Sequence, residues 1–207
     1  MNEQLLKMNG LSVDTLDALS FESHLGIPLR KDLHYFNKDA LIDELTKLTE
    51  WLDEQEILLD IALDYRVKSV DSILLKYNRY YPDHQTRKVF NDILGFRAFC
   101  DSYEPILEGE SAQFRIADMT KGKAEDDGYR GVHVYYHKSG RHYPIEIEFN
   151  TLFDRQLNNW LHDYLYKKDY PVETGKIMRE KYENGLIRNE YEFKEVLNNV
   201  LSGSERS

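Results

Sequence analysis

The sequence predicts an α+β fold, or a mixed α/β one, in which helices come first, a mainly antiparallel sheet follows and helices return at the end. Two observations lead to this prediction. Apolar residues recur at helical spacing near both ends of the chain, and four strand-like segments lie between them. The 207 residues, 41% of them hydrophobic and 13% aromatic, suffice for one ordinary domain with a real core.

The first part of the chain reads as helical. Residues 1–36 predict one or two short helices. From Asn37, a plausible cap, leucines recur every three or four residues, which predicts a helix running to about Tyr65. A second helix is expected over 69–80, because Pro82 disfavours helical backbone in the residue before it.

Strands are expected over 95–101, 111–119, 129–137 and 142–150, the last two joined by a hairpin at the sequence KSG. Helical spacing then returns over 153–164 and 191–201. We therefore divide the chain into an N-terminal helical segment (1–36), a central domain (37–170), and C-terminal helices with a loose tail (171–207).

The bulk composition narrows the function classes. With 27 basic and 37 acidic residues the net charge is −10, so any polyanion must be met by a local cluster of Lys and Arg. Cys100 is the only cysteine, which excludes an intrachain disulfide and a cysteine-based zinc site. Neither a signal peptide nor a membrane-spanning run is recognisable, and a reducing cytoplasmic setting is expected.

A cationic stripe is the first candidate for chemistry. Lys68, Ser72 and Lys76 are spaced four apart and so share one face of the expected helix, with Arg66 just before it. Charge and a helix N-terminus together suit the phosphates of a nucleotide. The stripe is equally typical of a solvated helix face.

Other polar residues stand where strands begin. Asp92 precedes a strand that carries Arg97, and it either holds a metal or caps a turn. Gly128 lets the chain bend before Tyr129, whose ring either stacks on a base or packs in the protein. Arg130 and His133 are polar neighbours of that tyrosine, and a strand histidine is more often structural.

The stretch YPIEIEFNT alternates strictly, with Glu146 and Glu148 on the face opposite the apolar residues. Such acids are most often exposed to water. If Asp92 lies on a neighbouring strand, however, Asp92 and Glu146 can share one Mg²⁺, a cation that prefers one or two carboxylates plus phosphate oxygens.

In combination these motifs resemble the RelA/SpoT synthetase domain over roughly residues 40–170. The resemblance lies in Arg66-x-Lys68-x3-Ser72-x3-Lys76, Asp92-x-x-Gly95-x-Arg97, Gly128-Tyr129-Arg130-x-x-His133 and Glu146-x4-Thr151, in that order, with His162 and YKK (166–168) after them.

This resemblance implies a nucleotidyltransferase-like mixed sheet flanked by helices, and transfer of pyrophosphate from ATP to a ribose 3′-hydroxyl. Arg66 and Arg97 would sandwich adenine. Lys68, Ser72 and Lys76 would hold the ATP phosphates. Asp92 and Glu146 would bind Mg²⁺, Glu146 would also activate the hydroxyl, and Tyr129 would stack on the acceptor base with Arg130 and His133 beside it.

The departures from the family pattern concern the acceptor. Alarmone synthetases, which modify GDP or GTP, usually read EIQIRT where this chain reads EIEFNT, so Glu148 and Asn150 replace Gln and Arg. The chain is therefore similar to stand-alone small synthetases of the toxin–antitoxin branch, which modify the 3′ CCA end of tRNA. Arg30 and Lys31, with Arg87 and Lys88, are then candidate tRNA contacts.

Three functions follow from these observations. The first is a tRNA 3′-pyrophosphokinase that inhibits translation and is paired with an antitoxin. The second is a (p)ppGpp synthetase that uses GDP or GTP. The third is an inactive nucleotide-binding module that kept the fold.

Overall fold

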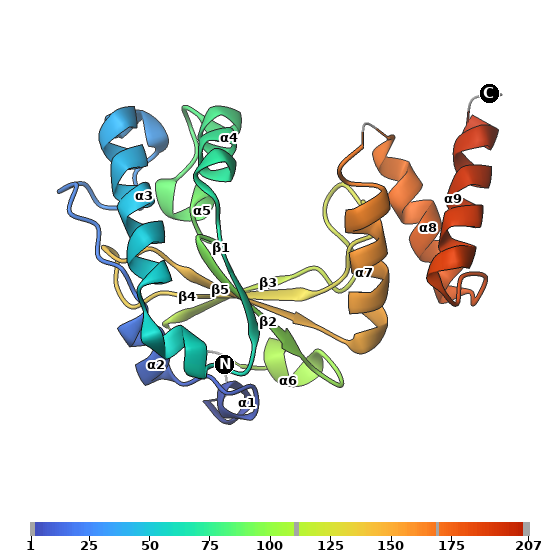
Figure 1. Cartoon of the computed structure of the whole chain (residues 1–207), viewed down its shortest axis with the longest axis horizontal. Helices are drawn as coiled ribbons and strands as arrows, with labels where there is room; N and C mark the ends of the chain where they lie inside the picture. The colour runs from blue at the N-terminus through green and yellow to red at the C-terminus, as the bar shows by residue number, and fades with distance from the viewer. Residues whose placement is uncertain (1–2, 110–111, 169, 205–207) are drawn as a thin grey trace. The chain divides into compact units, whose positions relative to one another are not determined.

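The computed structural model describes residues 3–109, 112–168 and 170–204 (Figure 1). The chain forms two compact units. The first comprises the residues up to Ala98 together with 104–117 and 133–149. The second comprises 99–103, 118–132 and the residues from Asn150 onward. Each unit is described separately.

Two short helices, α1 (Glu3–Met8) and α2 (Val13–Ala18), and the 3₁₀ turn η1 (Leu33–Tyr35) precede the long helix α3 (Lys38–Asp53) in the first unit. The Asn37 side chain caps α3 by accepting a hydrogen bond of 3.0 Å from the Ala40 amide. The short helices and this cap were expected.

The prediction that this helix runs to Tyr65 is wrong. The helix ends at Asp53, and the chain then forms the 3₁₀ segment η2 (Glu56–Asp60) and strand β1 (Asp64–Val67). Three of the four β1 residues are exposed, so the strand lacks the apolar alternation that would have revealed it.

The sheet has five strands in the order β1-β2-β5-β4-β3, where the others are β2 (Leu94–Phe99), β3 (Phe114–Asp118), β4 (Val132–Tyr136) and β5 (Ile145–Asn150). Strand β1 runs antiparallel to β2 and pairs Arg66 with Gly95. The predicted class, a mixed sheet flanked by helices, is confirmed.

Helix α4 (Val70–Tyr80) follows β1 closely and packs beside α3, as Figure 1 shows. The short helices α5 (Thr86–Val89) and α6 (Glu104–Leu107) complete the unit. Its core takes Ile73 and Tyr77 from α4, Phe96 from β2 and Ile147 from β5, all of them buried. Because Ile147 is buried, its neighbours Glu146 and Glu148 point to the opposite face of the sheet.

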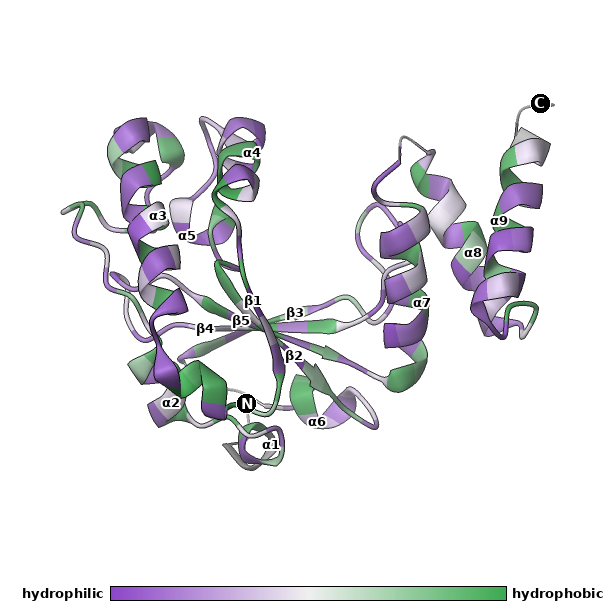
Figure 2. Cartoon of the chain, in the orientation of Figure 1, coloured by the Kyte–Doolittle hydropathy of each residue, from purple (hydrophilic) through white to green (hydrophobic). Residues whose placement is uncertain are grey.

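The second unit is built on α7 (Leu152–Tyr164), α8 (Val172–Glu183) and α9 (Glu190–Ser204), which pack on one another. Figure 2 shows hydrophobic and hydrophilic turns alternating along α7 and α9. Helix α8 falls within the C-terminal helices expected over 171–207, but its range was not predicted, because Thr174, Gly175 and Arg179 stand among its buried positions where apolar residues are expected.

Helix α9 continues to Ser204, so the expected loose tail does not begin at Ser202; residues 205–207 lie outside the described part of the chain. Among the described residues no helix is long and apolar enough to cross a membrane.

Candidate active site

A buried carboxylate organises the site in the first unit. Asp92, only 6% exposed, accepts hydrogen bonds from Lys68 Nζ at 2.5 Å and from Lys76 Nζ at 2.9 Å. Arg66 Nη2 lies 3.4 Å from the same carboxylate. The alternative that Asp92 merely caps a turn does not account for three cations gathered on one acid.

These cations come from one short stretch of the chain, residues 66–76, but from three different parts of the structure. Arg66 is on β1, Lys76 is on α4, and Lys68 lies in the link between them, before Ser69, whose side chain caps α4. The expectation that Lys68 lies on the helix is therefore wrong, because the helix begins at Val70. The backbone amide of Lys68 is tied to the Ile93 carbonyl at 2.8 Å, which keeps the lysine next to Asp92.

The electrostatics favour an ionised Asp92. Burial by itself raises the pKa of a carboxyl, but Lys76 and Lys68 outweigh it and hold the pKa of Asp92 below its usual value. Burial lowers the pKa of Lys68, with Asp92 opposing the shift and Lys76 and Arg66 adding to it. The cluster thus carries more positive charge than its one carboxylate neutralises, and this surplus suits phosphate groups.

A second buried carboxylate, Glu146, lies on β5 and is 7% exposed. Its Oε1 is 2.9 Å from His133 Nδ1, which is hydrogen-bond distance. Its Oε2 is 4.0 Å from Arg66 Nη2, so Arg66 lies near both acids.

Glycine at position 95 makes this arrangement possible. A Cβ there would lie 3.3 Å from Glu146 Oε2 and 3.8 Å from Arg66 Nε, closer to the carboxylate than ordinary packing allows. The glycine in the DILGFR motif therefore leaves space for the acid and the cation to approach each other.

Glu148 and Asn150, the next two residues on the same face, have different surroundings. Glu148 Oε2 lies 3.8 Å from Arg97 Nε. Asn150, in the second unit, is fully buried and donates from Nδ2 to the Arg130 carbonyl at 3.0 Å. The polar face of β5 is thus largely sheltered from water, and Asn150 serves to hold a loop.

The donor set fits a hard cation that is shared with a substrate. Among the described residues no group of three or more His, Cys, Asp and Glu side chains could hold a metal ion. Asp92 and Glu146 supply two carboxylates, which is what Mg²⁺ uses when phosphate oxygens and water complete its shell.

Ser72, the remaining predicted phosphate contact, is half-buried on α4, and its hydroxyl lies 2.9 Å from the Ser69 hydroxyl.

The second unit contains the loop with Gly128, Tyr129 and Arg130. Gly128 has a φ of +85°, a conformation that L side chains rarely adopt. Tyr129 lies in the loop, three residues before β4 begins, and Lys123 Nζ is 4.9 Å from the centre of its ring. Arg130 pairs with Asp126 at 2.7 Å.

The carbonyl groups of this loop accept hydrogen bonds from side chains of α7, of α8 and of the turn that follows α7. Tyr166 donates to Asp127 O at 3.0 Å, Arg179 Nε to Gly128 O at 2.8 Å, and Asn158 Nδ2 to Arg130 O at 2.7 Å. The loop is fixed in one conformation because its backbone acceptors are satisfied by groups on packed helices.

Arg179 is central to that network and is fully buried. Its Nη1 donates to Asp154 Oδ1 at 2.7 Å and its Nη2 to Asn158 Oδ1 at 3.1 Å. Next to it the backbones of Gly128 and Gly175 approach so closely that a Cβ on Gly175 would lie 1.9 Å from the Asp127 carbonyl oxygen.

The N-terminal basic pair lies beside a second one in the first unit. Arg30 and Lys31 are exposed. The Arg87 amide donates to Leu29 O at 2.9 Å, and the Thr86 amide donates to Lys31 O at 3.0 Å. The four cations Arg30, Lys31, Arg87 and Lys88 thus come from two adjacent segments.

Comparison with known proteins gives structural likeness only. No family model and no curated protein matches the chain. The solved structures similar to it include small alarmone synthetase 1 of Bacillus subtilis bound to its product pppGpp (22% identity, 80% of this chain and 89% of that one, TM-score 0.42), small alarmone synthetase 2 of the same organism (19%, 82% and 92%, TM-score 0.42), and a GTP pyrophosphokinase family protein of Streptococcus pneumoniae (21%, 81% and 93%, TM-score 0.39).

These neighbours are of the family that the sequence motifs resemble. Their identity and TM-scores are low, so the function proposed for this chain rests on its own residues.

Sequence reasoning singled out Asp92, Lys68, Lys76, Arg66 and Glu146, which the structure brings close to one another. It missed Arg179, Asn158 and Tyr166. An isolated arginine in a charged helix gives no sign that it is buried, so no signal in the sequence could have identified Arg179.

Proposed function

We propose that the chain transfers the β,γ-pyrophosphate of ATP to a ribose 3′-hydroxyl. The observation that carries this proposal is the cluster in which three cations converge on the buried Asp92 beside a second buried carboxylate, Glu146. The two lysines suit a triphosphate, and a nearby carboxylate suits the proton of an attacking hydroxyl.

In the proposed step the acceptor 3′-oxygen attacks the β-phosphorus of ATP. The bond from that phosphorus to the oxygen bridging the α- and β-phosphates breaks, AMP leaves, and Glu146 takes the hydroxyl proton. His133 orients Glu146 through the 2.9 Å hydrogen bond, and Lys68 and Lys76 hold the transferring phosphates.

Asp92 and Glu146 would also hold Mg²⁺, which when bound neutralises charge on the phosphates. Following the resemblance, Arg66 and Arg97 take the adenine, Ser72 assists with the phosphates, and Tyr129 stacks on the acceptor base.

For the acceptor we favour the 3′ CCA end of tRNA, with inhibition of translation and a neutralising antitoxin as consequences. Two observations support this choice. Asn150, where alarmone synthetases usually carry Arg, is engaged with the Arg130 carbonyl, and the exposed Arg30 and Lys31 lie beside Arg87 and Lys88. GDP or GTP is the second candidate, because the ATP-side residues serve either acceptor.

The deciding experiment offers both acceptors in parallel with ATP labelled at the γ-phosphate. Label should move to deacylated tRNA, and periodate-oxidised tRNA, which lacks the hydroxyl, should stay unlabelled. ATP labelled at the α-phosphate should label neither acceptor. Label on GDP and never on tRNA would replace the favoured acceptor, and no transfer to either would reject the function.

A further inference from the structure

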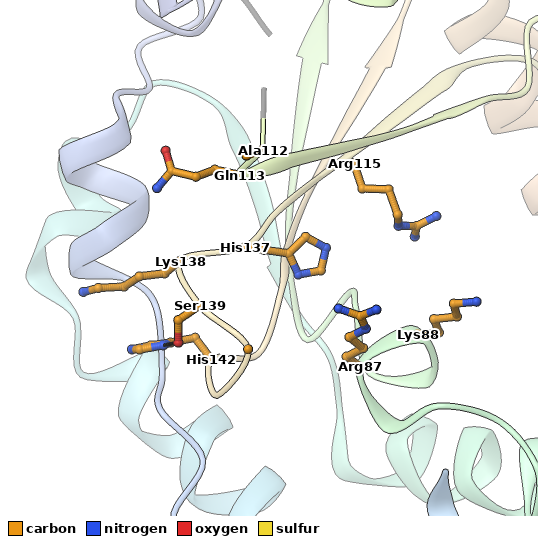
Figure 3. Close-up of a pocket in the computed structure, with 10 residues that line it drawn as sticks. Arg87, Lys88, Ala112, Gln113, Arg115, His137, Lys138, Ser139 and His142 are labelled. Atoms are coloured by element: carbon orange, nitrogen blue, oxygen red, sulfur yellow. Dashed lines mark hydrogen bonds between the residues drawn. The ribbon is translucent and has the colours of Figure 1, made fainter. Parts of the chain in front are cut away.

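A cationic pocket lies in the first unit, beyond the residues assigned to ATP. Its volume is about 440 Å³, and it is lined by α5, β3 and the segment that follows β4 (Figure 3). The cations that line it are Arg87, Lys88, Arg115 and Lys138, together with the imidazoles of His137 and His142. No carboxylate is among the lining residues in the described part of the chain.

The four cations differ from the lysines around Asp92 in their partners. Within the described ranges none of them forms an ion pair with a carboxylate, whereas Lys68 and Lys76 both bind Asp92. Arg115 lies over the Tyr135 ring, 4.3 Å from its centre, and Lys138 Nζ donates to the Asp17 carbonyl at 3.1 Å. In a chain of net charge −10, so much unpaired positive charge in one cavity is complementary to an anion.

The imidazole of His137 reflects this local charge. Burial, reinforced by Arg87 and Arg115, lowers the pKa of His137 to about 4. In Figure 3 its ring points toward the side of the pocket on which Arg87 and Arg115 lie. The pocket at neutral pH thus presents fixed cations and a neutral imidazole that can donate a hydrogen bond.

The pocket is connected to Glu146 along β4. His133, Tyr135 and His137 are two residues apart and therefore share one face, and the His137 amide continues the strand by bonding Gln113 O at 2.8 Å. His133 contacts Glu146, and the Tyr135 hydroxyl is 3.4 Å from His133 Nδ1.

From His133 to His137 the strand spans about 13 Å. In duplex DNA each strand carries one phosphate per roughly 3.4 Å of helix axis, and an unstacked single strand extends further per nucleotide, so this span corresponds to a few nucleotides at most.

We infer that this pocket binds backbone phosphates of the acceptor RNA strand, on the 5′ side of the nucleotide that reacts. The inference rests on the proposed function. It adds a second place at which the protein binds the acceptor, at a distance from the nucleotide that reacts. It adds Arg115, His137 and Lys138 to the basic surface of Arg30, Lys31, Arg87 and Lys88.

The test measures RNA binding without turnover. A 12-nucleotide single-stranded RNA that ends in CCA and carries a 5′ fluorescein is titrated with Glu146→Gln protein, and its anisotropy is followed over a range of salt concentrations. Adding Arg87→Gln and Lys138→Gln should weaken binding at least tenfold at low salt. Loss of two phosphate contacts should also reduce the slope of log K against log salt by about 1.4, since each contact on a single strand contributes about 0.7.

The matched control adds Lys47→Gln and Lys194→Gln, which remove the same charge from exposed ion pairs outside the pocket. It should bind RNA within twofold of the parent, and thermal shifts with ATP should be equal in all three proteins. Equal RNA binding by the pocket variant and the control would overturn the inference. The inference would also be overturned if the parent protein bound no RNA. It would be overturned equally if the Arg87 and Lys138 replacements weakened GTP binding but left RNA binding unchanged.

A failure of the proposed function is distinguished from a failure of this inference by the transfer assay. If the unmutated protein transfers label to neither acceptor while the RNA-binding result holds, the transferase is rejected and the phosphate pocket stands.

Discussion

Glu146 and Glu148 stand two residues apart on one face of β5, yet their partners differ. Glu146 is bonded to His133 and lies beside Gly95 and Arg66, whereas Glu148 lies near Arg97. Glu146 shares the cation Arg66 with Asp92. At the scale of single residues, the two acids are therefore expected to behave differently when replaced.

Glu146→Gln should lower pyrophosphate transfer by at least about 100-fold, because the amide cannot accept the hydroxyl proton, a role worth roughly 10²–10⁴ in rate. Glu148→Gln, the matched control on the same strand, should keep transfer within about fivefold. Initial rates of label transfer at saturating ATP measure both. Equal losses in the two variants would contradict the assignment of Glu146 as the base.

Asp92 should also contribute to folding in a pH-dependent way. Its pKa is lower in the folded chain than in the unfolded one, so its stabilisation is present above the unfolded value, near 4, and is lost as the pH falls through the folded value. Asp92→Asn should therefore cost about 3 kcal/mol of unfolding free energy at pH 7, since it leaves the partly buried Lys68 and Lys76 without their carboxylate partner.

Urea unfolding at pH 7 and at pH 3 measures this effect, and the difference between variant and parent should shrink at the lower pH. Asp60→Asn, at an exposed position, is the control and should change stability by less than about 0.5 kcal/mol at both pH values. A difference that grows in acid would contradict the ion pairing described for Asp92.

At the scale of elements, helix α8 has a specific task in the second unit. It brings Arg179 under the Gly128 carbonyl, and its Gly175 allows the loop backbone to approach. The loop with Tyr129 thus depends on a helix that lies more than forty residues later in the chain. Sequence position alone would assign α8 to a C-terminal appendage.

Arg179→Ala should destabilise the second unit by about 3–5 kcal/mol, because it removes the buried guanidinium that pairs with the partly buried Asp154 carboxylate and donates to the Gly128 carbonyl. Arg188→Ala removes an exposed arginine paired with Glu192 in the same unit and should cost less than about 1 kcal/mol. Chemical denaturation followed by tryptophan fluorescence compares the two, since Trp160 packs on Tyr182 and Phe193. Equal losses would contradict the role of Arg179.

At the scale of the whole molecule, the net charge of −10 contrasts with two local cationic regions, one around Asp92 and one in the pocket beside His137. The first is partly neutralised by a carboxylate and the second is not. A protein that repels polyanions overall can thus bind them at defined places, and binding there should stabilise the fold.

ATP with Mg²⁺ at 100 times its Kd should stabilise the chain by about 2.7 kcal/mol and raise its Tm accordingly. Lys68→Ala should lose most of that shift, because Lys68 belongs to the proposed phosphate site, whereas Lys47→Ala, on the exposed face of α3, should keep it. Differential scanning fluorimetry with and without ATP makes the comparison. A full shift in Lys68→Ala would remove this lysine from the ATP site.

The sequence by itself determined the class of fold, most strands and helices, and the residues of the cluster around Asp92. It could do so because apolar periodicity is a local property of the chain. The spacing of motif residues, moreover, can be recognised even where the helix or strand that carries them is predicted wrongly. Lys68 was assigned to a helix that begins two residues later, yet it was still grouped with Asp92 in one site, where the two are hydrogen-bonded.

Only the tertiary structure decided the rest. Strand β1 is mostly exposed and needs β2 to exist, so its own residues do not reveal it. Arg179 and Asn150 are buried only because distant segments close over them, and the pocket beside His137 forms where α5 meets β3 and the end of β4. Burial and charge pairing depend on contacts between segments that are far apart in the chain, so they cannot be predicted from local sequence patterns.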